Sequence, residues 1–219
     1  MTKCENIFIF DLGGVLINLN VPRCIARFRE LMDDESLRSV LGLGDDGEGI
    51  AAVSAASQQL MVDFERGNIS ADDFVTEVLR CCHPGTTRRQ VTDAWLSMLA
   101  DLPQERLDFV RKLKEQGKHV YLLSNGNDIH FSLINQTFRL DTYFDRMFLS
   151  QELHLAKPDP AIYEYVERAI NPTHGTVVFI DDLEKNRLAA QQSVGWKTFE
   201  SINQLTTHLR DGYERHTGR

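Results

Sequence analysis

The hydrophobic residues of this chain follow two different patterns, and each pattern occupies its own part of the sequence. Short, mainly apolar runs stand at 7–10, 119–123 and 177–180. Runs of this length and composition are typical of strands that are buried on both faces of a parallel sheet. Two shorter runs, at 146–149 and 197–199, complete the set of strands that we expect.

Segments with helical spacing lie between these strands. Leu107, Val110 and Leu113 recur on one face of a helix that we expect to begin near Pro103 and to end at Gly117. Similar patterns predict helices at 129–136, 160–170, 183–194 and 203–213. Strands that alternate with helices predict right-handed crossovers. We therefore expect the α/β class, with a Rossmann-like parallel sheet as its core and helices on both faces.

The stretch between about residue 21 and residue 102 shows no strand pattern. We expect helices there at 21–33, 36–41, 51–66, 70–82 and 87–99, with a glycine- and acid-rich loop at 42–49. The sequence thus predicts an all-helical cap domain at 19–100, inserted into a core domain formed by 1–18 and 101–219. Because both ends of the insertion return to the carboxyl edge of the sheet, the cap should lie over that edge as a lid.

Composition narrows the class of protein. The chain has 219 residues and a formal net charge of −8, which argues against a general nucleic-acid binder. No apolar run is long enough to span a membrane. The cysteines, Cys4, Cys24, Cys81 and Cys82, form no CxxC pair, and we find no signal-peptide pattern. We therefore expect reduced thiols in a cytoplasmic protein, as a monomer or a weak homodimer.

Polar and charged groups follow four of the expected strands. They are Asp11, Ser124 with Asn125, Lys157, and Asp181 with Asp182. Taken singly, each has an ordinary structural reading: Ser124 can cap a turn, Lys157 can be solvated, and Asp181 can begin a helix. In a parallel sheet, however, the carboxyl ends of the strands meet at one edge, where ligands bind. We therefore expect these side chains to converge.

Such a convergence would have a definite chemistry. Asp11, Asp181 and Asp182 would repel one another and raise one another's pKa. Mg²⁺ relieves that repulsion, because it binds carboxylates together with waters and phosphate oxygens. Ser124 and Lys157 would add a donor and a positive charge for an anionic group. This inventory matches phosphoryl transfer, with a carboxylate nucleophile that forms an aspartyl-phosphate.

The four stretches also carry a family resemblance. An apolar run ending in Asp-x-x-Gly-Val, then one ending in Ser-Asn, then Lys-Pro-Asp-Pro, then an apolar run ending in Asp-Asp resembles the four motifs of the haloacid dehalogenase (HAD) superfamily. The branch with a small helical cap after the first motif is the one that the chain resembles. The residues at 10–16 and at 64–70 are similar to the corresponding sequences of bacterial α-glucose-1-phosphatase-like members.

The resemblance implies a role for each residue. Asp11 would be the nucleophile, and Lys157 would neutralise charge between it and the phosphate. Ser124 would hydrogen-bond the transferring phosphoryl group, aided by the Asn125 amide. Mg²⁺ would be held by Asp11, the backbone carbonyl of Gly13, Asp182, and Asp181 either directly or through water. The substrate would be a small phosphorylated metabolite.

One position departs from the family pattern. Most phosphatases of this superfamily carry a second Asp two residues after the nucleophile, where this chain has Gly13. That Asp serves as general acid and base, a role that contributes about 10²–10⁴-fold. A sugar phosphate such as a hexose 1-phosphate would need less help, since its anomeric oxygen leaves easily. Asn18 or a cap residue such as Glu65 could lie near the position of the missing acid and base.

Two alternatives follow from the same departure. The chain could be a 2-haloacid dehalogenase-type hydrolase, which lacks the second Asp and works without metal. It could also be a catalytically reduced HAD-fold binding protein. The paired Asp181 and Asp182 suit a metal, and the retention of Asp11, Ser124 and Lys157 argues against loss of chemistry.

Overall fold

The computed structural model of the chain describes residues 5–41, 55–172 and 175–217. A five-stranded sheet forms its centre, in the order β3-β2-β1-β4-β5, and every neighbouring pair is parallel. The strands are β1 (Glu5–Phe10), β2 (His119–Ser124), β3 (Arg146–Leu149), β4 (Thr176–Ile180) and β5 (Lys197–Phe199). The predicted strands and the α/β class are thus confirmed. The loop expected at 42–49 lies outside the described residues.

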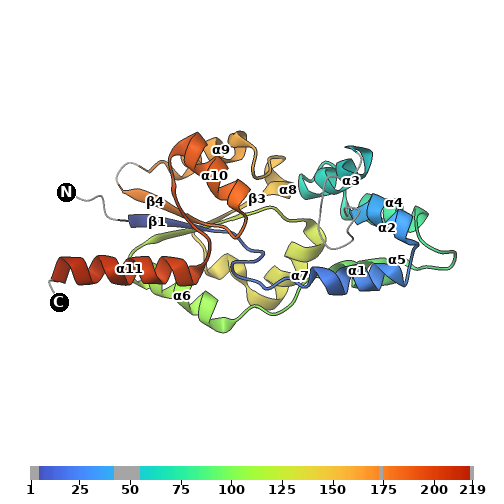
Figure 1. Cartoon of the computed structure of the whole chain (residues 1–219), viewed down its shortest axis with the longest axis horizontal. Coiled ribbons are helices and arrows are strands. Elements are labelled where there is room, and N and C mark those ends of the chain that lie inside the picture. The colour runs from blue at the N-terminus through green and yellow to red at the C-terminus, as the bar shows by residue number, and fades with distance from the viewer. Residues whose placement is uncertain (1–4, 42–54, 173–174, 218–219) are drawn as a thin grey trace.

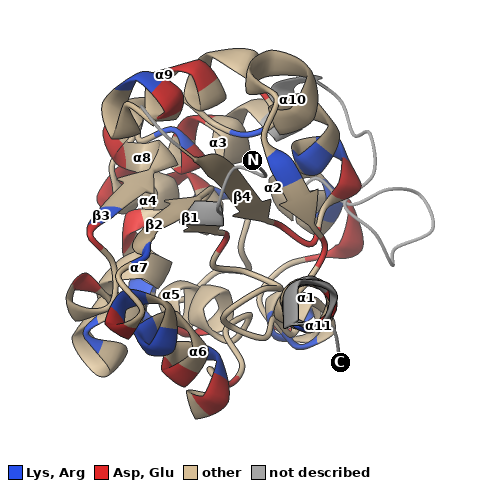
Figure 2. Ribbon diagram, turned by 90° about the vertical axis from the view of Figure 1, so that its left-hand side faces the viewer, with Lys and Arg blue, Asp and Glu red and all other residues tan. Residues whose placement is uncertain are grey.

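Helices cover both faces of the sheet (Figures 1 and 2). One face carries α6 (Gln104–Glu115), α7 (Asp128–Phe138) and α11 (Ile202–Thr217), and the other carries α9 (Pro160–Ile170) and α10 (Glu184–Val194). Alternation along the strands explains the two layers, since Phe8 and Phe10 pack on the α6 side whereas Ile7 and Ile9 pack on the α9 side. Two short elements were not predicted, η1 (Leu140–Thr142) and α8 (Ser150–Leu153).

Charged residues of both signs are interspersed over the helices that surround the sheet (Figure 2). None of the described helices has the length and apolarity that crossing a membrane requires.

The helical insertion has a hydrophobic core of its own. Its helices are α1 (Val21–Arg29), α2 (Asp34–Leu41), α3 (Ala55–Glu65), α4 (Ala71–Arg80) and α5 (Arg88–Leu96). Phe64 and Phe74 stack at 4.1 Å between ring centroids, and Trp95 packs against both. The first helix ends four residues earlier than predicted, because Asp33 accepts the Ser36 N–H and starts α2 instead. In Figure 1 these helices lie beyond the carboxyl ends of the strands.

Two linkers join the helical insertion to the sheet, and they run side by side. The Asn18 N–H donates to the Asp101 carbonyl at 2.8 Å, and the Ala100 N–H donates back to the Asn18 carbonyl at 2.9 Å. The Asn20 N–H reaches the Met98 carbonyl at 2.7 Å. Entry and exit therefore form a short antiparallel pair at one place, as the sequence led us to expect.

Candidate active site

The first and last acidic stretches of the sequence meet at the centre of the sheet. Asp11 follows β1 directly, Asp181 and Asp182 follow β4 directly, and these two strands are neighbours. The Asp11 N–H donates to the Ile180 carbonyl at 2.8 Å, which continues the pairing past the strand ends. β2 and β3 lie on one side of β1, and β4 and β5 lie on the other, so the order of the strands reverses between β1 and β4. The carboxylates thus stand at the topological switch point, where open α/β sheets bind their ligands.

Lys157 lies between two of these carboxylates. Its Nζ is 2.9 Å from Asp11 Oδ1 and 2.6 Å from Asp181 Oδ2, and it also donates to the Leu123 carbonyl at 3.0 Å. Only 1% of its side chain is exposed, so the solvated-lysine alternative is wrong. The ammonium has three donors and uses all three, which fixes its position. We call the set Asp11, Ser124, Lys157, Asp181 and Asp182 the mouth.

The two adjacent aspartates differ in how their oxygens are used. The carboxylate of Asp181 is fully buried and accepts from Lys157, from the Leu183 N–H at 2.9 Å and from Asn186 Nδ2 at 3.0 Å. Asp182 is exposed toward the mouth. Asp181 therefore holds Lys157 in place, and Asp182 has the freer carboxylate of the two.

The three carboxylates fit a metal ion. One oxygen from each of Asp11, Asp181 and Asp182 lies within 4.8 Å of the others. Gly14, at φ +73°, packs against the Asp182 carboxylate so closely that a Cβ there would collide with it. The glycine turn after Asp11 is thus the surface against which Asp182 is held. Clustered carboxylate oxygens beside a backbone turn are a donor set that suits Mg²⁺.

The mouth is electrostatically unbalanced without a cation. Burial raises the pKa of Asp11 to about 7, even though Lys157 opposes the shift. Burial and the neighbouring Asp181 charge raise the pKa of Asp182. Burial opposes the charge of Lys157, but Asp11 and Asp181 outweigh it and raise the lysine pKa. One ammonium thus faces three acids, and a divalent cation would let all three ionise.

The stretch after β2 positions Lys157 as well as facing the mouth. The Asn125 side chain pairs with the Lys157 backbone in both directions, at 2.8 Å each. This leaves the backbone N–H of Asn125, and not its side chain, for the predicted phosphate contact. Ser124 is buried, and its hydroxyl makes only a long contact of 3.3 Å with the Asn125 carbonyl. The hydroxyl can therefore turn toward a ligand at little cost.

The helical insertion docks on the mouth through a contact that we call the seam, formed by residues 65–67 and 150–154. Ser150 Oγ donates to the Glu65 carbonyl at 2.5 Å and accepts from the Gly126 N–H at 3.1 Å. Gly67, at φ +66°, lies so close to the Gln151 carbonyl that a Cβ there would clash. The seam thus connects the end of α3 to the loop that follows Ser124.

A second contact joins the insertion to the core at α7. The ring of His130 stacks on Trp95, with centroids 5.1 Å apart, and its two nitrogens contact Asn127 Nδ2 and the Trp95 carbonyl. Trp95 Nε1 donates to Asn127 Oδ1 at 3.3 Å. Burial lowers the pKa of His130, so this junction is held by a neutral ring.

Several supporting residues were not identified from the sequence. Asn186 holds Asp181, and Arg187 Nη1 donates to the carbonyls of both Asp181 and Asp182 at 2.7 Å. Ser150 bridges the seam from a helix of only four residues. The sequence offered one indication of these contacts. Asn186 and Arg187 follow Asp181 and Asp182 by about one helical turn, a spacing at which side chains can reach back to the end of the strand.

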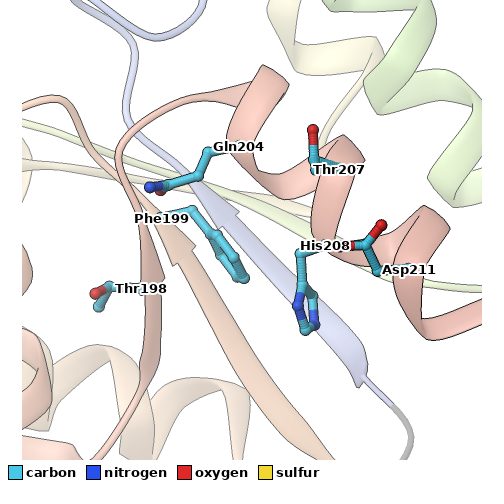
Figure 3. Close-up of a pocket in the computed structure, with 6 residues that line it drawn as sticks. All are labelled: Thr198, Phe199, Gln204, Thr207, His208 and Asp211. Carbon is cyan, nitrogen blue, oxygen red and sulfur yellow. The ribbon is translucent and has the colours of Figure 1, made fainter.

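A separate hollow lies between β5 and α11 (Figure 3). Its lining residues are Thr198, Phe199, Gln204, Thr207, His208 and Asp211. None of the residues of the mouth lines it, so it adds nothing to the predicted chemistry.

Comparisons with known proteins agree with this geometry. Residues 5–193 match the family model for haloacid dehalogenase-like hydrolases. A D-ribitol-5-phosphate phosphatase from Bacteroides thetaiotaomicron is 25% identical over 201 residues, which cover 89% of this chain and 91% of that protein. An (S)-2-haloacid dehalogenase from Burkholderia cepacia is 29% identical, but over only 50% of this chain and 48% of its own.

A solved structure extends the likeness to three dimensions. It is an HAD family enzyme from Bacteroides thetaiotaomicron in complex with magnesium and inorganic phosphate. It is 31% identical, has a TM-score of 0.71, and the match covers 89% of this chain and 93% of that one. With the motifs, the sheet and the family match in agreement, the chain belongs to the haloacid dehalogenase-like hydrolases.

Proposed function

We propose that this protein is a Mg²⁺-dependent phosphatase that hydrolyses a small phosphorylated sugar or polyol through a covalent phosphoryl group on Asp11. The observation that carries the proposal is Lys157, buried between Asp11 and Asp181 beside a cluster of three carboxylates. A metal-free dehalogenase would have no use for such a cluster. The relatives that match most of the chain include a phosphatase and a structure with magnesium and phosphate bound.

Mg²⁺ would be held by Asp11, the Gly13 carbonyl and Asp182. Asp181 would act on it through water, because its own oxygens are already engaged by Lys157, Leu183 and Asn186. When bound, the ion neutralises phosphate charge and orients the phosphoryl group for in-line attack.

The protein's own groups carry the covalent chemistry. The Asp11 carboxylate attacks phosphorus, and the bond from phosphorus to the leaving oxygen breaks. The Leu12 N–H, at 2.7 Å, and Lys157 hold that carboxylate in one orientation. Ser124 and the Asn125 N–H donate to the phosphoryl oxygens, and Lys157 offsets their charge. Water then releases phosphate and restores Asp11.

We propose that residues 19–100 form the cap domain of this enzyme, over a core of 1–18 and 101–219. The paired linkers at Asn18 and Asp101 give it one attachment, and the seam and the Trp95–His130 stack give it two docking contacts. Closure of such a cap excludes water from the reacting phosphoryl group.

The substrate class rests on the leaving group. The relative that acts on D-ribitol 5-phosphate favours a polyol or sugar phosphate, and the hexose 1-phosphate hypothesis predicts a preference for an anomeric leaving oxygen. We also propose a cytoplasmic location, supported by the free thiols of Cys24, Cys81 and Cys82.

Steady-state phosphate release from a panel of sugar, polyol and alkyl phosphates tests the proposal. We expect turnover that needs Mg²⁺ and that falls at least about 10⁴-fold in Asp11→Asn. Higher kcat/KM for sugar 1-phosphates than for ribitol 5-phosphate would favour the anomeric hypothesis, and the reverse would favour a polyol. Halide release from 2-haloacids without Mg²⁺, or phosphate release unchanged in Asp11→Asn, would contradict the proposed function.

A further inference from the structure

Hydrolysis of an ordinary phosphate ester needs a group that can give and take a proton. The leaving oxygen must be protonated as its bond to phosphorus breaks, and water must lose a proton when it attacks the phosphoryl-Asp11. Gly13 stands at the position where many family members carry that group. Another residue must therefore supply it, unless the leaving group needs no proton.

The groups of the mouth already have other roles, so none of them is available as the general acid and base. Asp11 is the nucleophile, Asp182 is the free metal ligand, and the oxygens of Asp181 are engaged by Lys157, Leu183 and Asn186.

The other candidates near the mouth are committed as well. Both ring nitrogens of His130 have partners, and Asn18 donates its amide to Asp101 and is in any case no acid. Asp159 accepts the Ala161 N–H and pairs with Arg66.

Among the described residues near the mouth, Glu65 is the carboxyl group that remains. It is the last residue of α3, and its backbone carbonyl is fixed by Ser150, whose hydroxyl also binds the loop after Ser124. Figure 1 shows α3 and α8 side by side where the insertion meets the sheet. The end of α3 is therefore anchored at the mouth by its backbone, and the side chain is not needed for docking.

The Glu65 carboxyl group is free to act. Among the described residues it has no hydrogen bond or ion pair. Two cations from separate core elements act on it, Lys185 at the start of α10 and Lys157 in the mouth. Burial raises its pKa although both lysines oppose the shift. The carboxyl group is thus within electrostatic range of both lysines, and burial favours its protonated form.

The seam beside Glu65 also contains buried polar atoms that a ligand could pair. Arg66 Nε and Gln151 Oε1 are both buried, and neither has a hydrogen-bond partner among the described residues. A Cβ built on Gly126 would lie 3.6 Å from Gln151 Oε1 and 3.8 Å from Ser124 Oγ, so this unpaired acceptor and the Ser124 hydroxyl border the same glycine. Buried polar atoms are normally paired, and hydroxyl groups of a sugar or polyol would pair these.

We propose that Glu65 is the general acid and base of this enzyme, delivered to the mouth by the cap, and that the leaving group lies along the seam. This inference rests on the proposed phosphatase function. As Asp11 attacks, the Glu65 carboxyl group gives its proton to the leaving oxygen, which departs as an alcohol. The resulting carboxylate takes a proton from water, whose oxygen attacks phosphorus and frees the Asp11 carboxylate.

The test compares Glu65→Gln with wild type on two substrates. One is an alkyl phosphate, whose leaving oxygen needs a proton, and the other is 2,4-dinitrophenyl phosphate, whose phenolate leaves without one. We expect Glu65→Gln to lose about 10²–10⁴-fold in kcat on the alkyl phosphate. On the aryl phosphate it should release one phenolate per enzyme in a rapid burst and then turn over slowly, because only the second step needs the base.

Matched variants separate chemistry from structure. Glu115→Gln removes an exposed carboxylate from the end of α6, away from the seam, and should keep wild-type kinetics on both substrates. Glu65→Asp keeps a shorter acid and should recover part of the lost rate. Calorimetric Mg²⁺ affinity should be the same in wild type and in Glu65→Gln, which shows that the mouth is intact.

The outcomes are distinguishable. If wild type hydrolyses the alkyl phosphate and Glu65→Gln does so equally well, the inference is wrong and the phosphatase function stands. Equal losses in the aryl burst and the alkyl turnover would show a structural role and would also overturn the inference. Absence of any phosphatase activity in wild type would overturn the proposed function, and the inference with it.

Discussion

The sheet side and the cap side of this site differ in how their carboxylates are paired. On the sheet side, Lys157 uses all three of its donors and Asp181 accepts from three groups. On the cap side, the carbonyls of Glu65 and Arg66 and an ion pair between Arg66 and Asp159 make the docking contacts at the seam, and the Glu65 carboxylate has no hydrogen bond among the described residues.

This difference separates two tasks. Attack on phosphorus needs a nucleophile and cations in fixed positions, and fully paired, buried side chains provide them. Recognition of a leaving group needs side chains that are free to pair with substrate. Because Glu65 docks through its backbone carbonyl, the cap supplies the carboxylate of this residue without using it for attachment. Changes on the sheet side should therefore affect folding and metal binding, and changes on the cap side should affect turnover.

The largest effect on the sheet side should come from Lys157→Met. Removal of the ammonium leaves Asp11 and Asp181 as uncompensated buried acids, which typically costs about 3–5 kcal/mol. Urea unfolding should show this loss in the absence of metal. Mg²⁺ should restore more stability to the variant than to wild type, because it replaces the missing charge.

Lys112→Met gives the matched control, since Lys112 is exposed on α6. We expect its free energy of unfolding to stay within about 0.5 kcal/mol of wild type. A Lys157→Met protein as stable as this control would mean that Lys157 does not balance the acids of the mouth.

A pair of glycine variants tests the division between the two sides more finely. Gly14→Ala would push the Asp182 carboxylate away and should weaken Mg²⁺ binding about 10–100-fold, the range seen when a supporting group of a metal site is lost. Gly67→Ala would clash with the Gln151 carbonyl across the seam. It should leave Mg²⁺ affinity unchanged but lower kcat/KM about tenfold, since this clash opposes docking and a cost of about 1.4 kcal/mol is enough for that loss.

The control for both is Gly195→Ala. Gly195 has φ +73°, the value of Gly14, but no atom lies within 4 Å of a Cβ built there. This variant carries the same backbone strain and should change neither Mg²⁺ affinity nor kcat/KM. Loss of Mg²⁺ affinity in Gly67→Ala, measured by calorimetry, would show that the two sides are not separable.

The sequence was enough to predict the sheet and the mouth because both depend on patterns of a few neighbouring residues. Each strand is a short apolar run, and Asp11, Ser124 and Asp181 stand at the end of one. A parallel sheet then brings strand ends together whatever their separation in sequence. Lys157 was expected at the same edge because it follows the strand at 146–149, but its role beside Asp11 came only from the resemblance to a known family.

The supporting contacts escaped prediction because their partners are distant in sequence. Ser150 lies 85 residues from Glu65, and α8 is too short to show any periodicity. The Asn125 side chain is polar in the way any loop residue is polar, and only the structure shows it bound to the Lys157 backbone. Such groups have no local signature, since their role is set by tertiary contact.

The smallest expected effect lies at the second docking contact. Burial lowers the pKa of His130, so the folded protein favours the neutral ring. Above the ordinary histidine pKa of about 6.5 both states are neutral and stability is complete. As the pH falls below it, the unfolded chain takes up a proton that the folded chain resists, and stability is lost until the lowered folded pKa is reached.

Thermal unfolding of wild type and His130→Gln checks this expectation. The unfolding temperature is measured from about pH 7.5 to about pH 5, a range that brackets the ordinary histidine pKa. The variant should lose less stability on acidification than wild type does, whereas His83→Gln, at an exposed position, should follow wild type. Parallel pH curves for wild type and His130→Gln would mean that the Trp95–His130 contact does not depend on a neutral ring.

The central claim is that Asp11 becomes phosphorylated during turnover. Acid quenching of the enzyme with Mg²⁺ and a hydrolysed sugar or polyol phosphate, followed by peptide mass spectrometry, tests it directly. We predict one added phosphoryl group on the peptide that contains Asp11, and none in Asp11→Asn. Turnover accompanied by phosphate on another residue, or by no covalent phosphate under any quench condition, would contradict the account.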